Sequence, residues 1–429
     1  MKLNLLSIIF FLSVTVSCFA GGSELYPLNG AKTLSLNGLY FAGSDGVVNS
    51  IINPASLIFV EDYGMEFSIG DRLSENKFER YNNSLYRSFR NDEYIINGGL
   101  YFSLTNNIKV GVSYQPSIKY NVEWPYANFF SKDSLSSLLV FDFFNRLTIE
   151  AFAPSAAFRF GNFTVGVAPV AYRIKHSLAF PRSNAAWANL NSAGYQFEYD
   201  QEGWAYGFSL GAIAQINPEI RLALSVRSGY SSNLNGTAQS KMFSELDSAS
   251  SIVNIKSKLE IPWIFGAGAL YAISSELTLN VDVQYSLWGS VQKSMNLSFD
   301  DAVWQGNLST VDPLTGITGS SFNLTYKNTI DIGAGLEYIP EGDLSYRFGY
   351  KYSQSPNQEE TYNMLFPSGD QHWFSAGFGL REENFLLDGT VSYAIGFSKN
   401  ITNGAVNNIN GKYSYSVIIP SISLKYLIR

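Results

Sequence analysis

Apolar and polar residues alternate one by one through much of the chain beyond residue 63. From Leu277 to Leu287, Leu, Val and Tyr hold the odd positions, and Thr, Asn, Asp, Gln and Ser hold the even ones. The same alternation runs through 108–115, 220–227 and 344–351. A period of two residues puts the two sets on opposite faces of a β-strand, whereas a helix would mix them around its circumference. The pattern therefore predicts an all-β protein.

Short polar turns divide the alternating region into six hairpins. One strand before the hairpins, around Met65 to Ile69, and one after them, around Val417 to Ile428, raise the predicted number of strands to fourteen. Longer polar connections lie between the hairpins. The turns are at 105–107, 161–162, 217–219, 274–276, 340–343 and 382–384, and the longer connections at 73–94, 120–145, 177–202, 231–258, 290–327, 354–370 and 398–413.

An even number of strands, with short turns at one end and long loops at the other, is typical of an outer-membrane barrel. We therefore predict a 14-stranded antiparallel transmembrane β-barrel over 64–429. A soluble β-sandwich would also alternate, but its strands are usually about five or six residues long and its connections need not alternate short with long. In a barrel the apolar face meets lipid and the polar face lines the lumen. The charged residues predicted to point inward are Lys109, Arg221, Arg227, Asp282, Arg347, Lys351 and Asp388.

Composition supports this fold class. Charged residues make up 15% of the chain, against roughly 25% in soluble globular proteins. Beyond the N-terminus no apolar run approaches the roughly 18 residues that a membrane-spanning helix needs. The net charge of −7 supplies no basic patch for nucleic acid. The composition therefore excludes a helical membrane protein and argues against a nucleic-acid-binding one.

Residues 1–20 have the features of a signal peptide. Lys2 provides a basic start, Leu5 to Val16 are apolar, and Cys18-Phe19-Ala20 ends in small residues at the cleavage positions. Cleavage just before Cys18, as in a lipoprotein, is the alternative. Cys18 is the only cysteine, so cleavage after Ala20 leaves a chain without disulfides or thiolate metal sites.

Residues 21–63 do not follow the strand pattern and end in Asn53-Pro54-Ala55. Because fourteen strands already close the barrel, this segment either hangs below the barrel in the periplasm or enters the lumen as a plug. Spacing alone does not choose between the two. We call residues 21–63 the hatch segment.

Three prolines fall inside predicted strands: Pro116, Pro154 and Pro169. Proline has no N–H to give to a ladder and is confined to sheet edges and bulges. Pro154 and Pro169 are equidistant from the turn at 161–162, so they should face each other, with Pro116 on the preceding strand. Either each proline relieves curvature, or together they mark a kinked opening through which an apolar ligand leaves sideways.

The sequence contains no convincing catalytic or metal-binding constellation, and we predict neither an enzyme nor a cofactor. Gly207-Phe208-Ser209-Leu210-Gly211 matches a nucleophile-elbow pattern, but it lies inside an alternating run instead of a strand-to-helix turn. His176 and His372 lie near predicted loop ends and are interpreted as solvated loop residues. Aromatic residues crowd the second long loop, either as a landing site for an apolar ligand or as loop packing: Trp124, Tyr126, Phe129, Phe130, Phe141, Phe143 and Phe144.

Four blocks of the chain share their residues and order with a known family. They are Gly30-Ala31-Lys32 through Gly38 and Asp45 to Asn53-Pro54-Ala55; Pro154 to Phe160; Asp282 to Trp288; and Tyr346 to Tyr350 with Ser355-Pro356, Phe366-Pro367, Asp370 and Trp373. In these blocks the chain resembles outer-membrane long-chain fatty-acid transporters of the FadL type and their aromatic-hydrocarbon channel relatives. Asn37 stands where family members often have Gly.

The resemblance implies a function in the outer membrane. It places the hatch segment in the lumen, with the barrel taking up long-chain fatty acids or aromatic hydrocarbons passively and releasing them through a kinked strand. The partners implied are outer-membrane lipid and a hydrophobic small molecule. A secretion-linked or structural barrel that binds a protein partner is the alternative. The residues that bind the ligand are left unassigned.

The signal segment and the strand count predict where the protein is found. The mature chain should fractionate with outer membranes and migrate faster on a gel before boiling than after it, because a closed barrel resists unfolding by detergent. Gel mobility with and without heating measures this. Recovery as a soluble periplasmic protein would contradict the barrel.

Overall fold

The computed structural model describes residues 29–43, 46–81, 84–125, 142–182, 195–241, 252–307, 320–362, 364–404 and 409–428. The predicted signal peptide and residues 21–28 of the hatch segment lie outside this described part.

Among the described residues, every helix is too short or too polar to cross a membrane.

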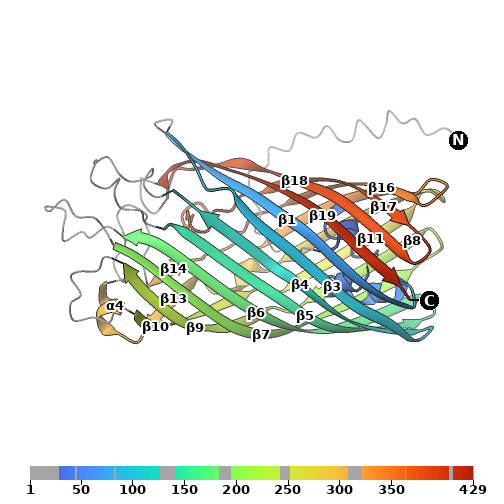
Figure 1. Cartoon of the computed structure of the whole chain (residues 1–429). Helices are drawn as coiled ribbons and strands as arrows, with labels where there is room; N and C mark the ends of the chain where they lie inside the picture. The colour runs from blue at the N-terminus through green and yellow to red at the C-terminus, as the bar shows by residue number, and fades with distance from the viewer. Residues whose placement is uncertain are drawn as a thin grey trace.

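The described strands form one closed antiparallel sheet of fourteen strands (Figure 1), which confirms the predicted fold class. The sheet closes where β1 pairs with β19. Two of the fourteen are each interrupted once, at 228–229 and at 262–263. In order round the barrel they are β1 (Tyr63–Arg80), β3 (Asn91–Thr105), β4 (Ile108–Glu123), β5 (Phe144–Phe160), β6 (Phe163–Arg182), β7 (Tyr195–Gln215), β8 (Ile220–Arg227) with β9 (Tyr230–Lys241), β10 (Ile252–Ile261) with β11 (Ile264–Ala272), β12 (Leu277–Ser286), β15 (Thr329–Tyr338), β16 (Leu344–Ser353), β17 (Gln371–Arg381), β18 (Phe385–Ile401) and β19 (Gly411–Leu427).

All six predicted short turns join paired strands, and they gather at one end of the barrel (Figure 1). We call this the short-turn end and the opposite end the long-loop end. The long connections carry a few small elements. These are β2 (Leu85–Arg87), β13 (Ser294–Phe299), β14 (Ser321–Asn323) and α4 (Ala302–Asn307).

Several strands run further toward the long-loop end than predicted. The first strand continues to Arg80, although 73–94 was predicted to be a connection, and β9 occupies much of 231–258. In β9 the outward positions Ser231, Asn233 and Asn235 are exposed and polar. Beyond the lipid an outward side chain need not be apolar, so polar residues occupy the outer face of β9 while its ladders with β7 and β10 continue.

The two faces of the wall differ as predicted at the short-turn end. On β1, for example, Met65, Phe67 and Ile69 point outward and are exposed, whereas Glu66 and Ser68 between them are buried. Arg221 donates to the Ala42 carbonyl of the hatch segment at 3.2 Å. The other charged side chains predicted to point inward are all buried: Lys109, Arg227, Asp282, Arg347, Lys351 and Asp388.

The described part of the hatch segment lies inside the short-turn end, where Figure 1 shows it in dark blue. It contains α2 (Ala31–Ser35) and two 3-10 helices, Val47–Ile51 and Pro54–Phe59, and nearly all of it is buried.

Inward-facing glycines make room for this segment. A Cβ on Gly166 would lie 2.2 Å from the Ala55 nitrogen, and one on Gly349 would lie 2.4 Å from the Asn37 nitrogen. Contacts that close exclude any side chain, so the hatch backbone packs directly on the strand backbone. Other inward glycines lie as close to backbone or side-chain atoms of the hatch, and the full set is Gly99, Gly111, Gly166, Gly211, Gly266, Gly268, Gly333, Gly335, Gly349 and Gly377.

Replacing Gly166 by Val should displace the hatch segment. The new Cβ would lie only 2.2 Å from the Ala55 nitrogen, and a backbone atom cannot move aside without moving the hatch. Trypsin should then cut after Lys32, which is protected in the parent, and mass spectrometry of the N-terminal fragment measures the cleavage. Gly389→Val is the control, since its nearest neighbour is the flexible ring of Phe378. Equal protection of Lys32 in both variants would contradict the packing.

Candidate functional site

The Asn53-Pro54-Ala55 turn fixes the top of the hatch. The Asn53 amide donates to the Phe41 carbonyl at 2.9 Å, and its oxygen accepts from the Ala55 nitrogen at 3.1 Å. Asn53 thus caps the 3-10 helix that Pro54 begins. The turn rests against Gly166 and Gly211 on neighbouring strands, which explains why a compact turn is needed here.

Side chains of the wall bind the rest of the hatch. Asp282 accepts from the Phe41 nitrogen at 2.9 Å and from the Asn37 amide at 3.2 Å, and Glu66 accepts from the Val47 nitrogen at 2.8 Å. Asn37 has a φ of 92°, in the left-handed region that Asn tolerates better than most residues. The substitution of Asn for the Gly frequent in the resembling family is therefore compatible with this backbone.

An ion-pair network ties α2 to the wall. Lys32 Nζ lies 3.0 Å from Glu337 Oε1, and Arg347 Nε lies 2.7 Å from the same oxygen. Arg347 Nη1 lies 2.6 Å from Asp388 Oδ1. Removing one member of such a buried network leaves a charge unpaired, which costs about 3–5 kcal/mol. The network therefore holds the hatch against β15, β16 and β18.

Above the hatch the inner face of the wall is apolar, which corrects the expectation that the polar face alone lines the lumen. Ile51 at the top of the hatch belongs to a buried cluster with Ile118, Ile149, Tyr172 and Ile264. The two tyrosines Tyr172 and Tyr230 stack within this cluster, with ring centroids 3.9 Å apart. In the upper strands the polarity of the two faces is thus reversed: Tyr172 and Ile174 on β6 are buried inside, whereas Arg173 and Lys175 alternate with them on the outward face.

A cavity of about 130 Å³ lies in this upper lumen. Most of its exposed lining is apolar, but the lining also includes Asn145, His176 and the charged residues Lys77, Glu260 and Lys399. That volume is close to the roughly 150 Å³ of an apolar cavity that binds benzene in another protein. Its apolar lining includes Ile118, Leu147, Leu259, Ile261, Trp288 and Tyr326.

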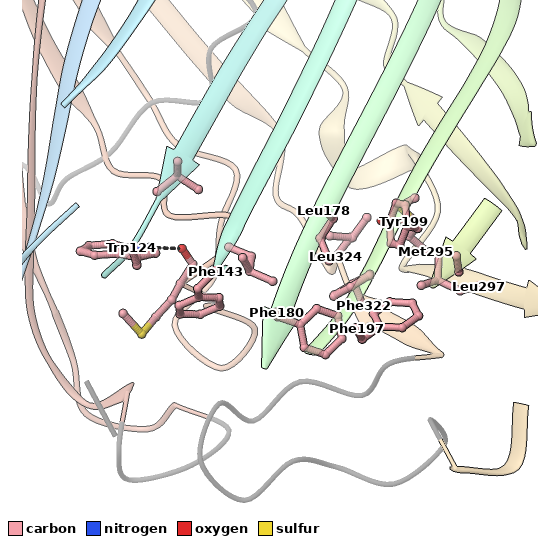
Figure 2. Packing of buried hydrophobic residues seen from close by; sticks show 14 of the residues in the cluster. Trp124, Phe143, Leu178, Phe180, Phe197, Tyr199, Met295, Leu297, Phe322 and Leu324 are labelled. Atoms are coloured by element: carbon pink, nitrogen blue, oxygen red, sulfur yellow. Dashed lines mark hydrogen bonds between the residues drawn. The ribbon is translucent and has the colours of Figure 1, made fainter. Parts of the chain in front are cut away.

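The connection 354–370, here called the roof loop, closes the cavity toward the long-loop end. Its Leu365 carbonyl accepts from the Asn145 amide at 2.8 Å and from the Tyr120 hydroxyl at 3.2 Å. Trp124 Nε1 donates to the Met364 carbonyl at 2.9 Å, the dashed line beside Trp124 in Figure 2. Main-chain carbonyls of the roof loop are therefore held by side chains projecting from the barrel wall.

Asp370 fixes the far end of the roof loop. Its carboxylate accepts from the Tyr352 hydroxyl and from the Ser355 nitrogen, each at 2.7 Å. Burial raises the pKa of the Asp370 carboxyl, and these two hydrogen bonds act in the opposite direction.

Aromatic residues pack around and beyond the roof loop in the largest buried cluster (Figure 2). Trp124 and Phe143, from the two ends of the aromatic connection, are fully buried in it. Phe144 begins β5. The others noted in that connection, Tyr126, Phe129, Phe130 and Phe141, lie outside the described residues.

The histidines and the serine motif serve as structural contacts. His176 is buried, contrary to the interpretation as a solvated loop residue: its Nε2 lies 2.8 Å from Asn145 Oδ1 and its Nδ1 lies 3.4 Å from the Tyr199 hydroxyl. His372 Nδ1 lies 2.7 Å from the Tyr350 hydroxyl. Ser209 lies within β7 and donates to the Ile51 carbonyl at 2.9 Å. Across the described ranges no group of three or more His, Cys, Asp or Glu side chains could hold a metal ion.

The wall itself opens between β3 and β4. Their ladder runs from the short turn only as far as Gly98 and Tyr114. Beyond it, β3 pairs only with β1, and β4 pairs only with β5. We call the separated edges, 91–97 and 115–123, the wall split.

A bulge and a few bridges define the wall split. Pro116 lies just inside it, and the β4–β5 register shifts between Pro116 and Ile118. Lys119 Nζ bonds to the Tyr94 carbonyl, the Asn91 amide donates to the Asn121 carbonyl at 3.3 Å, and the Phe89 nitrogen donates to the Glu123 carbonyl at 2.8 Å. Two side-chain bonds and one main-chain bond thus bridge the separated strands.

The other two predicted prolines lie in the adjacent hairpin. The β5–β6 ladder pairs Phe152 with Ala171 and Ala156 with Val167, and it lacks pairs in between. Pro154 and Pro169 lie opposite each other in that interruption, as their distance from the turn implies. The ladder resumes in the same register, so this break is shorter than the wall split.

These features together define a class of protein: a closed antiparallel barrel with an apolar outer face, filled at one end by its own N-terminal segment. Residues 41–427 match the family described as outer membrane protein transport protein (OMPP1/FadL/TodX). The chain belongs to this family, and the protein is an outer-membrane β-barrel.

Individual relatives are distant in sequence. A long-chain fatty acid transport protein of Escherichia coli is 23% identical over 208 residues, a match that spans 47% of this chain and 44% of that relative. A Pseudomonas aeruginosa FadL homologue matches in structure with a TM-score of 0.75 at 14% identity, over 95% of this chain and 99% of the homologue. The Ralstonia pickettii toluene transporter TbuX matches in structure with a TM-score of 0.68 at 17% identity, over 95% of this chain and 100% of TbuX. These structural likenesses show the same fold.

Asn145→Ala should loosen the roof loop, because it frees the Leu365 carbonyl and the buried His176 ring from their shared partner. We expect a loss of about 1–3 kcal/mol in the free energy of unfolding, measured by denaturant titration in lipid vesicles. Asn233→Ala, at an exposed position of β9, is the control and should change it by less than about 0.5 kcal/mol. A stability equal to that of the parent would show that the roof loop does not depend on Asn145.

Proposed function

We propose that the protein is a passive channel that takes hydrophobic molecules through the outer membrane. The observation that carries the proposal is the mostly apolar cavity inside the barrel beneath the roof loop. Ligand pockets are concave, mostly apolar and supplied with a few polar groups that fix orientation, as this one is. An apolar molecule crosses the polar outer leaflet poorly, so a cavity of this kind replaces water along its path.

The relatives suggest the class of substrate. One is named for long-chain fatty acids and another for toluene. A cavity of about 130 Å³ holds one aromatic ring or a short length of alkyl chain, so a longer chain must extend beyond it. We propose that substrates come from these two classes and that each occupies the cavity with a ring-sized apolar part.

The hatch segment acts in this proposal as a plug. Asn53, Pro54 and Ala55 hold its top against the wall, and the ring of glycines leaves little space around its backbone. A ligand in the cavity therefore has no direct route down to the periplasm while the hatch stays in place.

The wall split is the proposed exit. Ile118 lines the cavity and also follows the bulge at Pro116, so cavity and split share one strand. Pro154 and Pro169 interrupt the next ladder and leave that hairpin free to bend with β4. A ligand that leaves here enters the hydrocarbon of the membrane and avoids the aqueous space below. Alternatively, each proline only relieves curvature.

Pro116→Val tests the exit. Valine restores an N–H and favours a regular strand, so β4 should pair further with β3 and narrow the split. We expect uptake of labelled palmitate and toluene to fall at least about fivefold, with equal surface abundance, relative to cells that express the parent. The matched control is Pro420→Val, a proline on the lipid-facing side of β19 where the β1–β19 ladder is also interrupted.

The outcomes separate the proposals. Parental uptake by Pro116→Val would refute the lateral exit and leave the channel standing. Uptake by the parent no greater than by cells without the protein would refute the channel itself, and co-purification of an exported protein would then favour a secretion-linked barrel.

A further inference from the structure

Gln115 is a buried polar side chain at the lower corner of the wall split, and its amide is unsatisfied. It is fully buried, and neither its side-chain nitrogen nor its side-chain oxygen has a hydrogen-bond partner among the described residues. An unsatisfied buried polar group costs about 1–3 kcal/mol, so natural proteins seldom retain one without a use.

The direction of this side chain follows from its strand. On β4 a Cβ on Gly111 would meet Val47, and Ser113 Oγ lies 3.4 Å from Ser50 Oγ. Both of these positions face the hatch, and Gln115 is the next inward position along the strand. The inward position after the bulge is Ile118, which lines the cavity.

Gln115 therefore lies between three features. The hatch is below it, the cavity is above it, and the separated edge of β3 is beside it, because the β3–β4 ladder ends one residue earlier at Tyr114. On the other side Gln115 pairs with Ala151, a member of the apolar cluster. Asn97, also buried, holds the β3 position that would face Gln115 if the ladder continued.

We infer that the Gln115 carboxamide binds the single polar group of an otherwise apolar ligand as the ligand passes from the cavity to the wall split. A carboxamide offers one acceptor oxygen and two donor hydrogens, so it suits a hydroxyl or a protonated carboxyl group and gains nothing from a pure hydrocarbon. This inference rests on the proposed function and narrows it to ligands that carry one hydrogen-bonding group.

The chain provides a matched control in Gln201, another inward, buried glutamine. Its oxygen accepts from Ser257 at 2.8 Å and its nitrogen donates to the Leu234 carbonyl at 3.4 Å. Methionine resembles glutamine in length and shape and lacks its hydrogen-bonding groups. The same substitution therefore removes an unsatisfied amide at position 115 and a satisfied one at position 201.

The experiment compares p-cresol with toluene, which differ by one hydroxyl group. Saturable binding of each labelled compound is measured on outer-membrane vesicles that contain the parent, Gln115→Met or Gln201→Met, with vesicles lacking the protein subtracted. In Gln115→Met we expect p-cresol binding to weaken at least about fivefold while toluene binding stays within about twofold. The thermal midpoint of Gln115→Met should equal or exceed that of the parent, whereas Gln201→Met should have a lower one.

Two results would overturn the inference. One is an unchanged ratio of p-cresol to toluene affinity in Gln115→Met. The other is a fall in its thermal midpoint like that of Gln201→Met, which indicates a structural role. If Gln115→Met fails to fold, the affinities of the parent protein decide the question. After correction for partition into lipid, the inference requires the parent to bind p-cresol more tightly than toluene, and equal or weaker binding overturns it. Absence of saturable binding of both compounds to the parent would instead refute the proposed function.

Discussion

The structure depends on one constraint: a backbone that faces lipid must find its hydrogen-bond partners within the protein, because hydrocarbon supplies none. Closure of the sheet through β1 and β19 meets this constraint for the barrel as a whole. Any interruption of a ladder must therefore be compensated locally. At the wall split the compensation comes mainly from side chains, with Lys119 bonded to the Tyr94 carbonyl and Asn91 to the Asn121 carbonyl, and from one main-chain bond between Phe89 and Glu123. Side-chain bridges can break and re-form without unfolding a strand, so the split is the part of the wall that can change at least cost.

The same constraint decides how the hatch fills the lumen. Its short helices and turns leave main-chain groups unpaired, and polar side chains of the wall satisfy them. Asp282 binds the Phe41 nitrogen, Glu66 binds the Val47 nitrogen, and Ser209 binds the Ile51 carbonyl. Several of the charged inward residues, among them Lys109, Arg221 and Asp282, serve here as partners for a second layer of protein. Hatch and barrel thus share one hydrogen-bonding network at the short-turn end.

Some of this could be predicted from the sequence and some could not. The alternation and the turn residues were sufficient to predict the fourteen strands. The equal spacing of Pro154 and Pro169 from their turn was sufficient to place the two prolines opposite each other. The apolar upper lumen was not predicted, because the alternation continues past the bulge at Pro116 with the two faces exchanged: Ile118 and Val122 point inward, and Lys119 lies on the outward face. Periodicity alone does not tell which face of a strand is inside. The wall split was missed for another reason: Pro116 marks a bulge on its own strand and says nothing about which neighbouring strand separates. The sequence around Gln115 does not indicate a special role for this residue. Whether its side-chain amide finds a hydrogen-bond partner depends on groups that come near it only in the folded protein.

The roof loop covers the cavity at the long-loop end, and the hatch fills the short-turn end of the barrel. The two segments are held in the barrel by different kinds of contact. The hatch is bonded to strands all around the barrel and is locked by backbone contacts with glycines, such as Ala55 on Gly166. The roof loop is held by side chains that reach its carbonyls, among them Asn145 and Trp124, and by the burial of its own Met364 and Leu365 in the largest apolar cluster. Moving the roof loop leaves the ladders of the barrel intact, whereas releasing the hatch breaks the buried Lys32–Glu337–Arg347 network as well as its backbone packing. This difference favours entry past the roof loop and exit through the wall split, with the hatch in place throughout.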